Sequence, residues 1–140
     1  MNQSDQQVCD DLITLVNCIK TAAVQLAEAE GITRMQLFVM HSIRHKGNLA
    51  MGQVADALHC DASNVTGIVD RMVAQGLVVR TECERDRRAK TIELTEKGRK
   101  VIEQLNCKLP DRLGCDKLDA DERAMLHQII QKLCPVSPLE

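Results

Sequence analysis

The chain has 140 residues, 44% of them apolar, which suits a single domain with one hydrophobic core. Phe38 is the only aromatic residue, which argues against a single-stranded nucleic-acid platform built on aromatic stacking. The net charge is −2, but residues 71–100 carry nine Lys/Arg and five Asp/Glu (+4), whereas the remainder carries nine and fifteen (−6). A basic stretch inside an acidic chain indicates a nucleic-acid partner.

The sequence contains no apolar run of membrane length and no signal-like N-terminus, so we expect a cytoplasmic protein without a membrane partner. Its seven cysteines are scattered and odd in number, and no C-x-x-C occurs. This pattern argues against a disulfide framework or a zinc knuckle and favours reduced thiols. No cofactor is expected.

The first predicted element is a long helix over about residues 6–30, and Gly31 ends it. Apolar residues recur along it in steps of four and three: Val8, Leu12, Leu15, Ile19, Ala22 and Leu26. Such a seam suits packing against another helix, including one from a partner chain.

Three shorter helices follow. Thr33 and Gln36 form a capping pair before a helix with Leu37, Met40 and Ile43 on its inner face. A short helix then runs from about Met51 to Leu58, residues 59–61 form a tight turn, and a further helix continues to about Gln75 before Gly76. Two helices joined by such a turn predict a helix-turn-helix.

A β-hairpin is predicted next, with strands at residues 77–81 and 91–95 and a charged loop at 84–88. Thr95 caps a helix that Pro110 ends or kinks, and the acidic residues at 119–122 open the last helix. The fold expected is therefore mainly α with a small β-hairpin wing, as a winged helix-turn-helix over about 33–95, with dimerisation helices over about 6–30 and 96–134 of one domain, 1–140.

The helix over residues 62–74 has a small polar outer face when Val65, Ile68, Val69 and Met72 face the core. Small side chains let a helix approach base edges, and hydroxyl, amide and guanidinium groups bond bases or phosphates. The candidates for DNA contact on this helix are Ser63, Asn64, Thr66, Gly67 and Arg71, with Asp61 or Ser63 as the N-cap. The alternative is a generic helical hairpin with a solvated polar face.

The adjoining hairpin favours the DNA-binding interpretation. Its tip and returning strand carry Arg85, Arg87, Arg88 and Lys90, and a basic wing beside a recognition helix can reach the minor groove. Asp86 is expected to pair with Arg88 across the tip, although such a surface ion pair contributes little to stability.

Several stretches carry a family resemblance: Gly31-Ile32-Thr33 with Gln36, residues 54–58, residues 63–66, residues 69–72 and Gly76-Leu77-Val78. The most specific is Asp86-Arg87-Arg88 followed by Ile92, Leu94-Thr95 and Gly98, a D-R-R…I-x-L-T-x-x-G pattern. By these motifs residues 31–100 resemble the multiple-antibiotic-resistance regulator (MarR) family, and the flanking helices extend the resemblance to nearly the whole chain.

The resemblance implies a bacterial homodimer in which the terminal helices intertwine and two winged lobes bind a palindrome. By motif position it places Ser63, Asn64, Thr66 and Arg71 on the DNA, with Arg87 and Arg88 in the wing. Gly67 departs from relatives, which often carry a larger or basic side chain there. Two-fold symmetry would place the recognition helices about 34–36 Å apart, one turn of DNA.

Three features are candidates for an effector response. Cys9 and Cys18 on the first helix are candidate oxidant sensors, although inert thiols are the alternative and the chain has no Tyr to activate them. His41 and His45 have the i, i+4 spacing of metal ligands, with two solvated histidines as the alternative. A small apolar effector between the dimerisation helices and the winged lobe is what the resemblance suggests.

The sequence contains no recognised catalytic motif, so an enzyme is not expected. The main alternative to a regulator is a winged-helix module that binds protein and not DNA. A protein-binding surface would expose large apolar groups on residues 62–74 and on the wing, where this sequence has small polar groups and cations. The function predicted is a sequence-specific DNA-binding repressor that responds to a small molecule or an oxidant.

Overall fold

A computed structural model describes residues 2–83 and 86–134, apart from the side chains of residues 83 and 86–89. Six helices, a three-stranded sheet and one short 3₁₀ turn (Cys115–Lys117) follow one another along this part of the chain. In order they are α1 (Gln3–Ala29), α2 (Arg34–Lys46), β1 (Leu49–Ala50), α3 (Met51–Leu58), α4 (Ala62–Ala74), β2 (Val78–Cys83), β3 (Asp86–Leu94), α5 (Glu96–Arg112) and α6 (Ala120–Leu133). The predicted mainly helical fold with a hairpin wing is confirmed.

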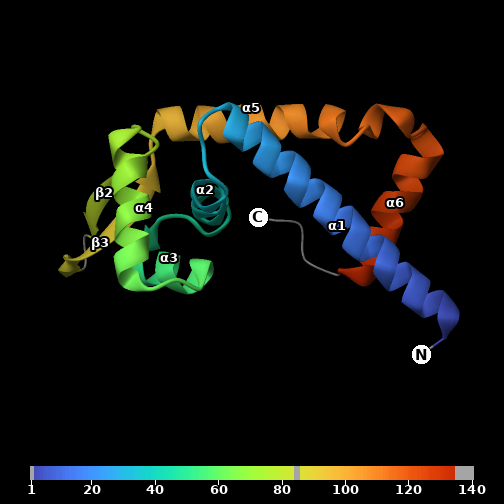
Figure 1. The fold of residues 1–140 in the computed structure, drawn as a ribbon, viewed down its shortest axis with the longest axis horizontal. Coiled ribbons are helices and arrows are strands. Elements are labelled where there is room, and N and C mark those ends of the chain that lie inside the picture. The colour runs from blue at the N-terminus through green and yellow to red at the C-terminus, as the bar shows by residue number, and fades with distance from the viewer. Residues whose placement is uncertain (1, 84–85, 135–140) are drawn as a thin grey trace.

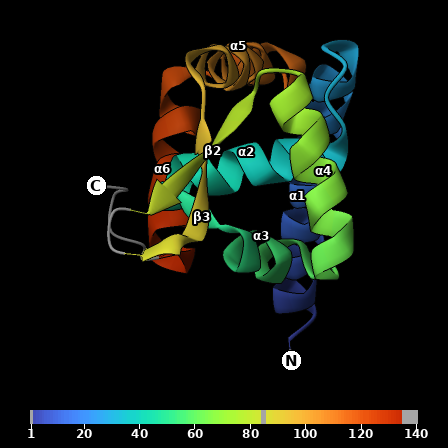
Figure 2. The same ribbon diagram turned by 90° about the vertical axis from the view of Figure 1, so that its left-hand side faces the viewer.

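The elements form two regions (Figure 1). The winged lobe comprises α2, α3, α4 and the sheet, and the helical frame comprises α1, α5 and α6. The first half of α5 belongs to both regions, because Ile102 and Leu105 are buried in the core of the lobe. In Figure 1 α1 and α6 cross, but the rotated view in Figure 2 separates them, so α6 stands away from α1.

The core of the winged lobe is aliphatic, as the composition predicts. Its largest fully buried side chains come from helices and strands alike: Val39, Met40, Val54, Val65, Val69, Met72, Val78, Ile92 and Ile102. Because all three short helices and the sheet contribute to one cluster, the apolar face of α4 packs into the core of the lobe.

The sheet has the order β1-β3-β2, with both pairs antiparallel. The two-residue strand β1, where Leu49 pairs with Ile92, was not predicted because two residues are too few to show an alternating pattern. The prediction of a loop at 84–88 was wrong for residues 86–88, which already belong to β3. The charges at these positions hid the strand, because a strand is recognised in a sequence by apolar alternation.

Helix ends follow the predicted signals in most places. Gly31, at φ +73°, follows the end of α1, and Thr33 and Gln36 form the predicted capping box of α2. Asp61 is the N-cap residue of α4, but its side chain accepts no capping bond. Ser63, the other candidate for the cap, lies inside the helix. Pro110 does not end α5, which continues to Arg112 because the N–H of Leu113 still bonds the carbonyl of Leu109 at 3.0 Å.

The helical frame leaves a large apolar surface uncovered. In α6, all of which is described, no residue is buried, and the stripe of Met125, Leu126, Ile129, Ile130 and Leu133 is 38–63% exposed. On α1, six further apolar side chains are exposed: Val8, Leu12, Ile13, Leu15, Val16 and Ile19. Patches of this extent mark contact surfaces rather than ordinary solvated helices.

By length and composition alone, α1 is apolar enough to cross a membrane. This corrects the expectation that the chain has no apolar run of that length. One such helix is weak evidence for a membrane span, since the core helix of a soluble protein and a signal sequence near the N-terminus meet the same criteria.

Candidate nucleic-acid interface

The turn between α3 and α4 sets the direction in which α4 leaves the lobe. His59 ends α3 in the left-handed conformation, at φ +50° and ψ +39°, and the N–H of Cys60 bonds back to the carbonyl of Ala55 at 3.2 Å. A non-glycine residue in this region is uncommon, and here it closes the end of α3, where the N–H of His59 also bonds to the carbonyl of Asp56 at 3.2 Å. Together α3, the turn and α4 form the predicted helix-turn-helix.

The two faces of α4 differ as the sequence predicts. Val65, Val69 and Met72 are buried, whereas Ser63, Asn64 and Thr66 are exposed on the side that leads away from the lobe. The backbone of this face is therefore accessible to a large partner, and no large apolar side chain covers it at these positions.

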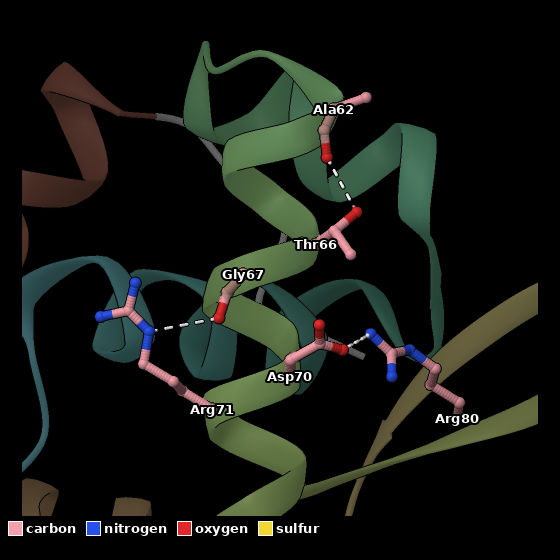
Figure 3. A network of polar contacts seen from close by, with 6 residues as sticks. All are labelled: Ala62, Thr66, Gly67, Asp70, Arg71 and Arg80. Atoms are coloured by element: carbon pink, nitrogen blue, oxygen red, sulfur yellow. Dashed lines mark hydrogen bonds and ion pairs between the residues drawn. The ribbon is translucent and has the colours of Figure 1, made fainter.

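Two side chains on α4 bond to the helix itself (Figure 3). The hydroxyl of Thr66 donates to the carbonyl of Ala62 at 3.0 Å, and Nε of Arg71 donates to the carbonyl of Gly67 at 3.3 Å. A Cβ added at Gly67 would meet only the Arg71 guanidinium, at 4.0 Å. Gly67 therefore leaves an open step on the helix, with the charge of Arg71 directly beside it.

An ion pair between Asp70 and Arg80, which no sequence pattern predicted, joins α4 to β2 (Figure 3). Ten residues and a helix-to-strand turn separate the partners, a spacing that matches no local pattern. The pair matters electrostatically because Asp70 is the one acidic residue in α4, where a free carboxylate would repel phosphate. Arg80 neutralises that carboxylate and braces the wing against α4.

Only part of the predicted wing lies within the described residues. Lys90 is exposed on β3, opposite Glu82 of β2. Arg87 and Arg88 belong to β3 by their backbone. Arg85, the side chains of Arg87 and Arg88, and therefore the predicted Asp86–Arg88 pair lie outside what the structure describes.

The candidate sensors lie apart from this surface. Cys9 and Cys18 are both exposed on α1, and Cys18 lines an open groove of about 540 Å³ between α1 and the end of α5. His41 and His45 stack with their ring centroids 6.2 Å apart. Burial lowers the pKa of His41, with smaller contributions from the charges of His45 and Arg44. No group of three His, Cys, Asp or Glu residues within the described part could hold a metal beside them.

A cavity lies where the frame meets the winged lobe, as an effector site there would require. It has a volume of about 280 Å³ and lies between α2, β3 and α5. Its lining mixes apolar side chains, such as Ile43 and Leu94, with the charged Arg44, Arg99 and Glu103. This lining is more polar than a site for the small apolar effector that the resemblance suggests.

Comparison with known proteins relates both the sequence and the fold to one family. Residues 30–89 match the sequence model of the MarR family. The chain is 32% identical over 101 residues to the HTH-type transcriptional repressor MdtR of Bacillus subtilis, an alignment that covers 70% of this chain and 65% of MdtR. The chain thus spans less than two thirds of that relative.

Solved structures extend the likeness to nearly the whole chain. Wild-type apo MarR from E. coli is 29% identical, with a TM-score of 0.68 over 90% of this chain and 96% of that one. The transcriptional regulator Tm0710 of Thermotoga maritima, at 24% identity, shares the fold with a TM-score of 0.77 over 94% of this chain and 92% of that one. The winged helix-turn-helix, the D-R-R wing pattern and these matches agree: residues 30–89 match the MarR family in sequence, and nearly the whole chain is similar to MarR in fold.

Proposed function

We propose that this protein is a homodimeric transcription regulator that binds a palindromic DNA duplex, with one winged lobe on each half-site. The observation that carries the proposal is the outer face of α4, which is exposed, small and polar and lies beside a basic hairpin. A major groove about 12 Å wide admits one such helix. The match of residues 30–89 to the MarR family and the likeness to the repressor MdtR support the same function.

The helical frame provides the dimer in this proposal. The exposed apolar stripes of α1 and α6 do not cover each other within one chain, so a second copy is the partner that buries both sets. Burial of this surface also accounts for an apolar α1 without any need for a membrane. The working unit is then a single domain in which α1, α5 and α6 pair two lobes.

The residues divide by the kind of contact they make. Ser63, Asn64 and Thr66, exposed at the start of α4, read base edges, while Gly67 lets the backbone come close. Arg71 and the wing cations Arg85, Arg87, Arg88 and Lys90 bind phosphate or enter the minor groove. The two classes predict different variant behaviour, because only base contacts carry sequence information.

Fluorescence anisotropy on labelled genomic duplexes tests this function. A dimer that contacts about six to ten phosphates loses roughly 10³–10⁵ in affinity between 50 and 200 mM salt. Arg88→Ala should weaken binding to every sequence and make it less salt-dependent, whereas Asn64→Ala should change the preferred sequence. Lys20→Ala, which removes an exposed cation from α1, is the matched control and should leave binding unchanged.

The absence of duplex binding at about 50 mM salt, where electrostatic attraction is strong, would contradict the proposal. Binding of a protein target through α4 with no affinity for DNA would instead support the protein-interaction alternative. We propose repression as the regulatory outcome, because occupancy of a promoter by a small dimer is sufficient for it. In this proposal the protein is not an enzyme and acts in the cytoplasm, where the DNA is.

Effector control is the least constrained part of the proposal. The cavity between α2, β3 and α5 lies where a small molecule could alter the angle between the lobe and the frame. The exposed Cys9 and Cys18 are the candidates for an oxidant response. Anisotropy before and after treatment with peroxide, repeated on Cys9→Ser and Cys18→Ser, distinguishes a thiol response from a ligand response.

A further inference from the structure

Gln36 is the one buried polar residue in the described part of the chain, with 4% of its surface exposed. Its side-chain carbonyl accepts from the N–H of Thr33 at 3.0 Å, which is the capping bond of α2. Glu would serve that role as well as Gln, because capping uses only the acceptor. The amide nitrogen of Gln36 is therefore not explained by the cap, and a buried amide nitrogen without a partner would be costly.

That nitrogen donates to the side chain of Gln75, at 2.9 Å, across 39 residues of sequence. Gln75 is the C-cap residue of α4. Its own amide nitrogen donates to the carbonyl of Gly31 at 3.4 Å, in the turn between α1 and α2. Its backbone carbonyl accepts from Nζ of Lys97 on α5 at 2.7 Å. One residue at the end of α4 thus bonds to α2, to the α1–α2 turn and to α5.

The bonds of Gln75 to Gly31 and to Lys97 link α4 directly to the frame, and the bond to Gln36 ties the same side chain to α2. α4 packs along α2, α3 and β2. The backbones of α1 and α5, two helices that the structure describes in full, make no comparable contact with it. The next residue strengthens the same junction, since the carbonyl of Gly76 accepts from the hydroxyl of Thr95, the N-cap of α5. Hydrogen bonds to other elements thus hold the C-terminal end of α4. Within the described residues, the N-terminal end has no such bond to another element.

We propose that Gln36 and Gln75 form a positioning joint that fixes the angle of α4 relative to the dimerisation helices. The inference rests on the proposed function and deepens it. In a symmetric dimer this angle sets the separation of the two recognition helices, and hence the half-site spacing that the dimer accepts. Neither glutamine touches DNA; both act through the placement of α4.

The test uses a duplex that the wild-type protein selects from a random pool, with versions in which the centre of the palindrome is one base pair longer or shorter. We expect wild type to bind the selected spacing at least about tenfold more tightly than the altered ones, because each lobe must meet its half-site in register. Gln75→Leu keeps the approximate size of the side chain and removes its two side-chain hydrogen bonds, to Gln36 and to Gly31. It should reduce that ratio to about threefold or less, because the freed α4 adjusts to either spacing.

Two further variants separate a joint from a general loss of stability. The double variant Gln36→Met with Gln75→Leu should reduce the ratio no more than Gln75→Leu alone, because the two residues share one bond. Gln104→Ala replaces an exposed glutamine of α5 that makes no side-chain bond within the described residues and should keep the wild-type ratio. Circular dichroism establishes that each variant is folded. The double variant also removes the amide nitrogen that Gln75→Leu alone leaves without a partner on the buried Gln36.

A wild-type spacing preference that Gln75→Leu retains would overturn the joint and leave the proposed function standing. The same holds if Gln104→Ala reduces the ratio as much as Gln75→Leu does, or if wild type binds all spacings alike. If the wild-type protein selects no duplex at all, the proposed function itself fails, and the joint fails with it.

Discussion

The winged lobe and the helical frame use the same apolar residue types in opposite ways. In the lobe, valines, isoleucines and methionines pack against one another in a core formed by one chain, and Val69, Met72 and Ile92 are completely buried. In the frame, α6 buries nothing, and Ile129 and Ile130 are 44% and 46% exposed. The lobe is therefore complete within one chain, whereas in the proposed dimer the frame is half of an interface. Substitutions should therefore affect folding in one region and association in the other.

The largest expected effect is on association. Ile129→Lys puts a charge into the apolar stripe of α6, twice in a symmetric dimer, and burying an unpaired charge costs several kcal/mol. We expect the dimer dissociation constant to rise at least about 1,000-fold, or about 4 kcal/mol, by analytical ultracentrifugation. Gln131→Lys, on the polar side of the same helix, is the control. A dimer that tolerates Ile129→Lys would show that α6 does not form the interface.

A smaller effect should appear in the folding of the lobe. A Cβ at Gly98 would lie 2.1 Å from the carbonyl oxygen of Leu77, so Gly98→Ala must move α5 or the start of the wing. We expect a loss of about 1–3 kcal/mol in the free energy of unfolding by urea denaturation. In contrast, a Cβ at Gly52 meets nothing within 4 Å, and Gly52→Ala should stabilise the protein by about 0.5–1 kcal/mol. Equal effects of the two substitutions would contradict the close contact.

A weaker effect is expected from the brace between α4 and β2. Asp70→Asn removes an ion pair whose side chains are 55% and 30% exposed, for Asp70 and Arg80 respectively, which limits its contribution to about 0.2–1 kcal/mol. The affinity for DNA should change more than the free energy of unfolding, because the variant frees Arg80 beside the proposed DNA-binding surface. We expect a steeper salt dependence of affinity by anisotropy, and an unchanged slope would mean that Arg80 stays away from the phosphates.

The smallest expected effect is on the pH dependence of unfolding. Burial lowers the pKa of His41 below its usual 6.5 in the folded chain, so the unfolded chain binds more protons as the pH falls. His41 therefore costs no stability well above pH 6.5 and reduces stability as the pH falls through that value. His41→Asn should reduce the change in thermal unfolding temperature between pH 7.5 and pH 5, while His127→Asn on α6 should not. A flat wild-type profile that His41→Asn leaves unchanged would refute this.

The sequence predicted most of the fold because the lobe follows local rules. Helical periodicity identified Val65, Val69 and Met72 as the inner face of α4, and Thr33 with Gln36 marked the start of α2. The missing parts depend on distant residues. β1 exists only because Leu49 lies beside Ile92, and the bonds of Asp70 to Arg80 and of Gln36 to Gln75 join residues that no local spacing relates. Asp61 occupies the cap position without making the capping bond, because its position is set by the turn at His59.

The candidate site divides in the same way. The polar face of α4 was predictable, since a helix that buries one side must expose the other. The neutralisation of Asp70, which makes that face suitable for a polyanion, was not. The metal candidate at His41 and His45 illustrates the reverse case, because the spacing is suitable but the described surroundings supply no third ligand.

The mass of the protein–DNA complex, measured by native mass spectrometry on a duplex selected by the protein, tests the whole account most directly. Pairing of two copies through α1 and α6, with one lobe on each half-site, predicts a complex of two chains on one duplex. A complex with a single chain, or no complex at low salt, would contradict it.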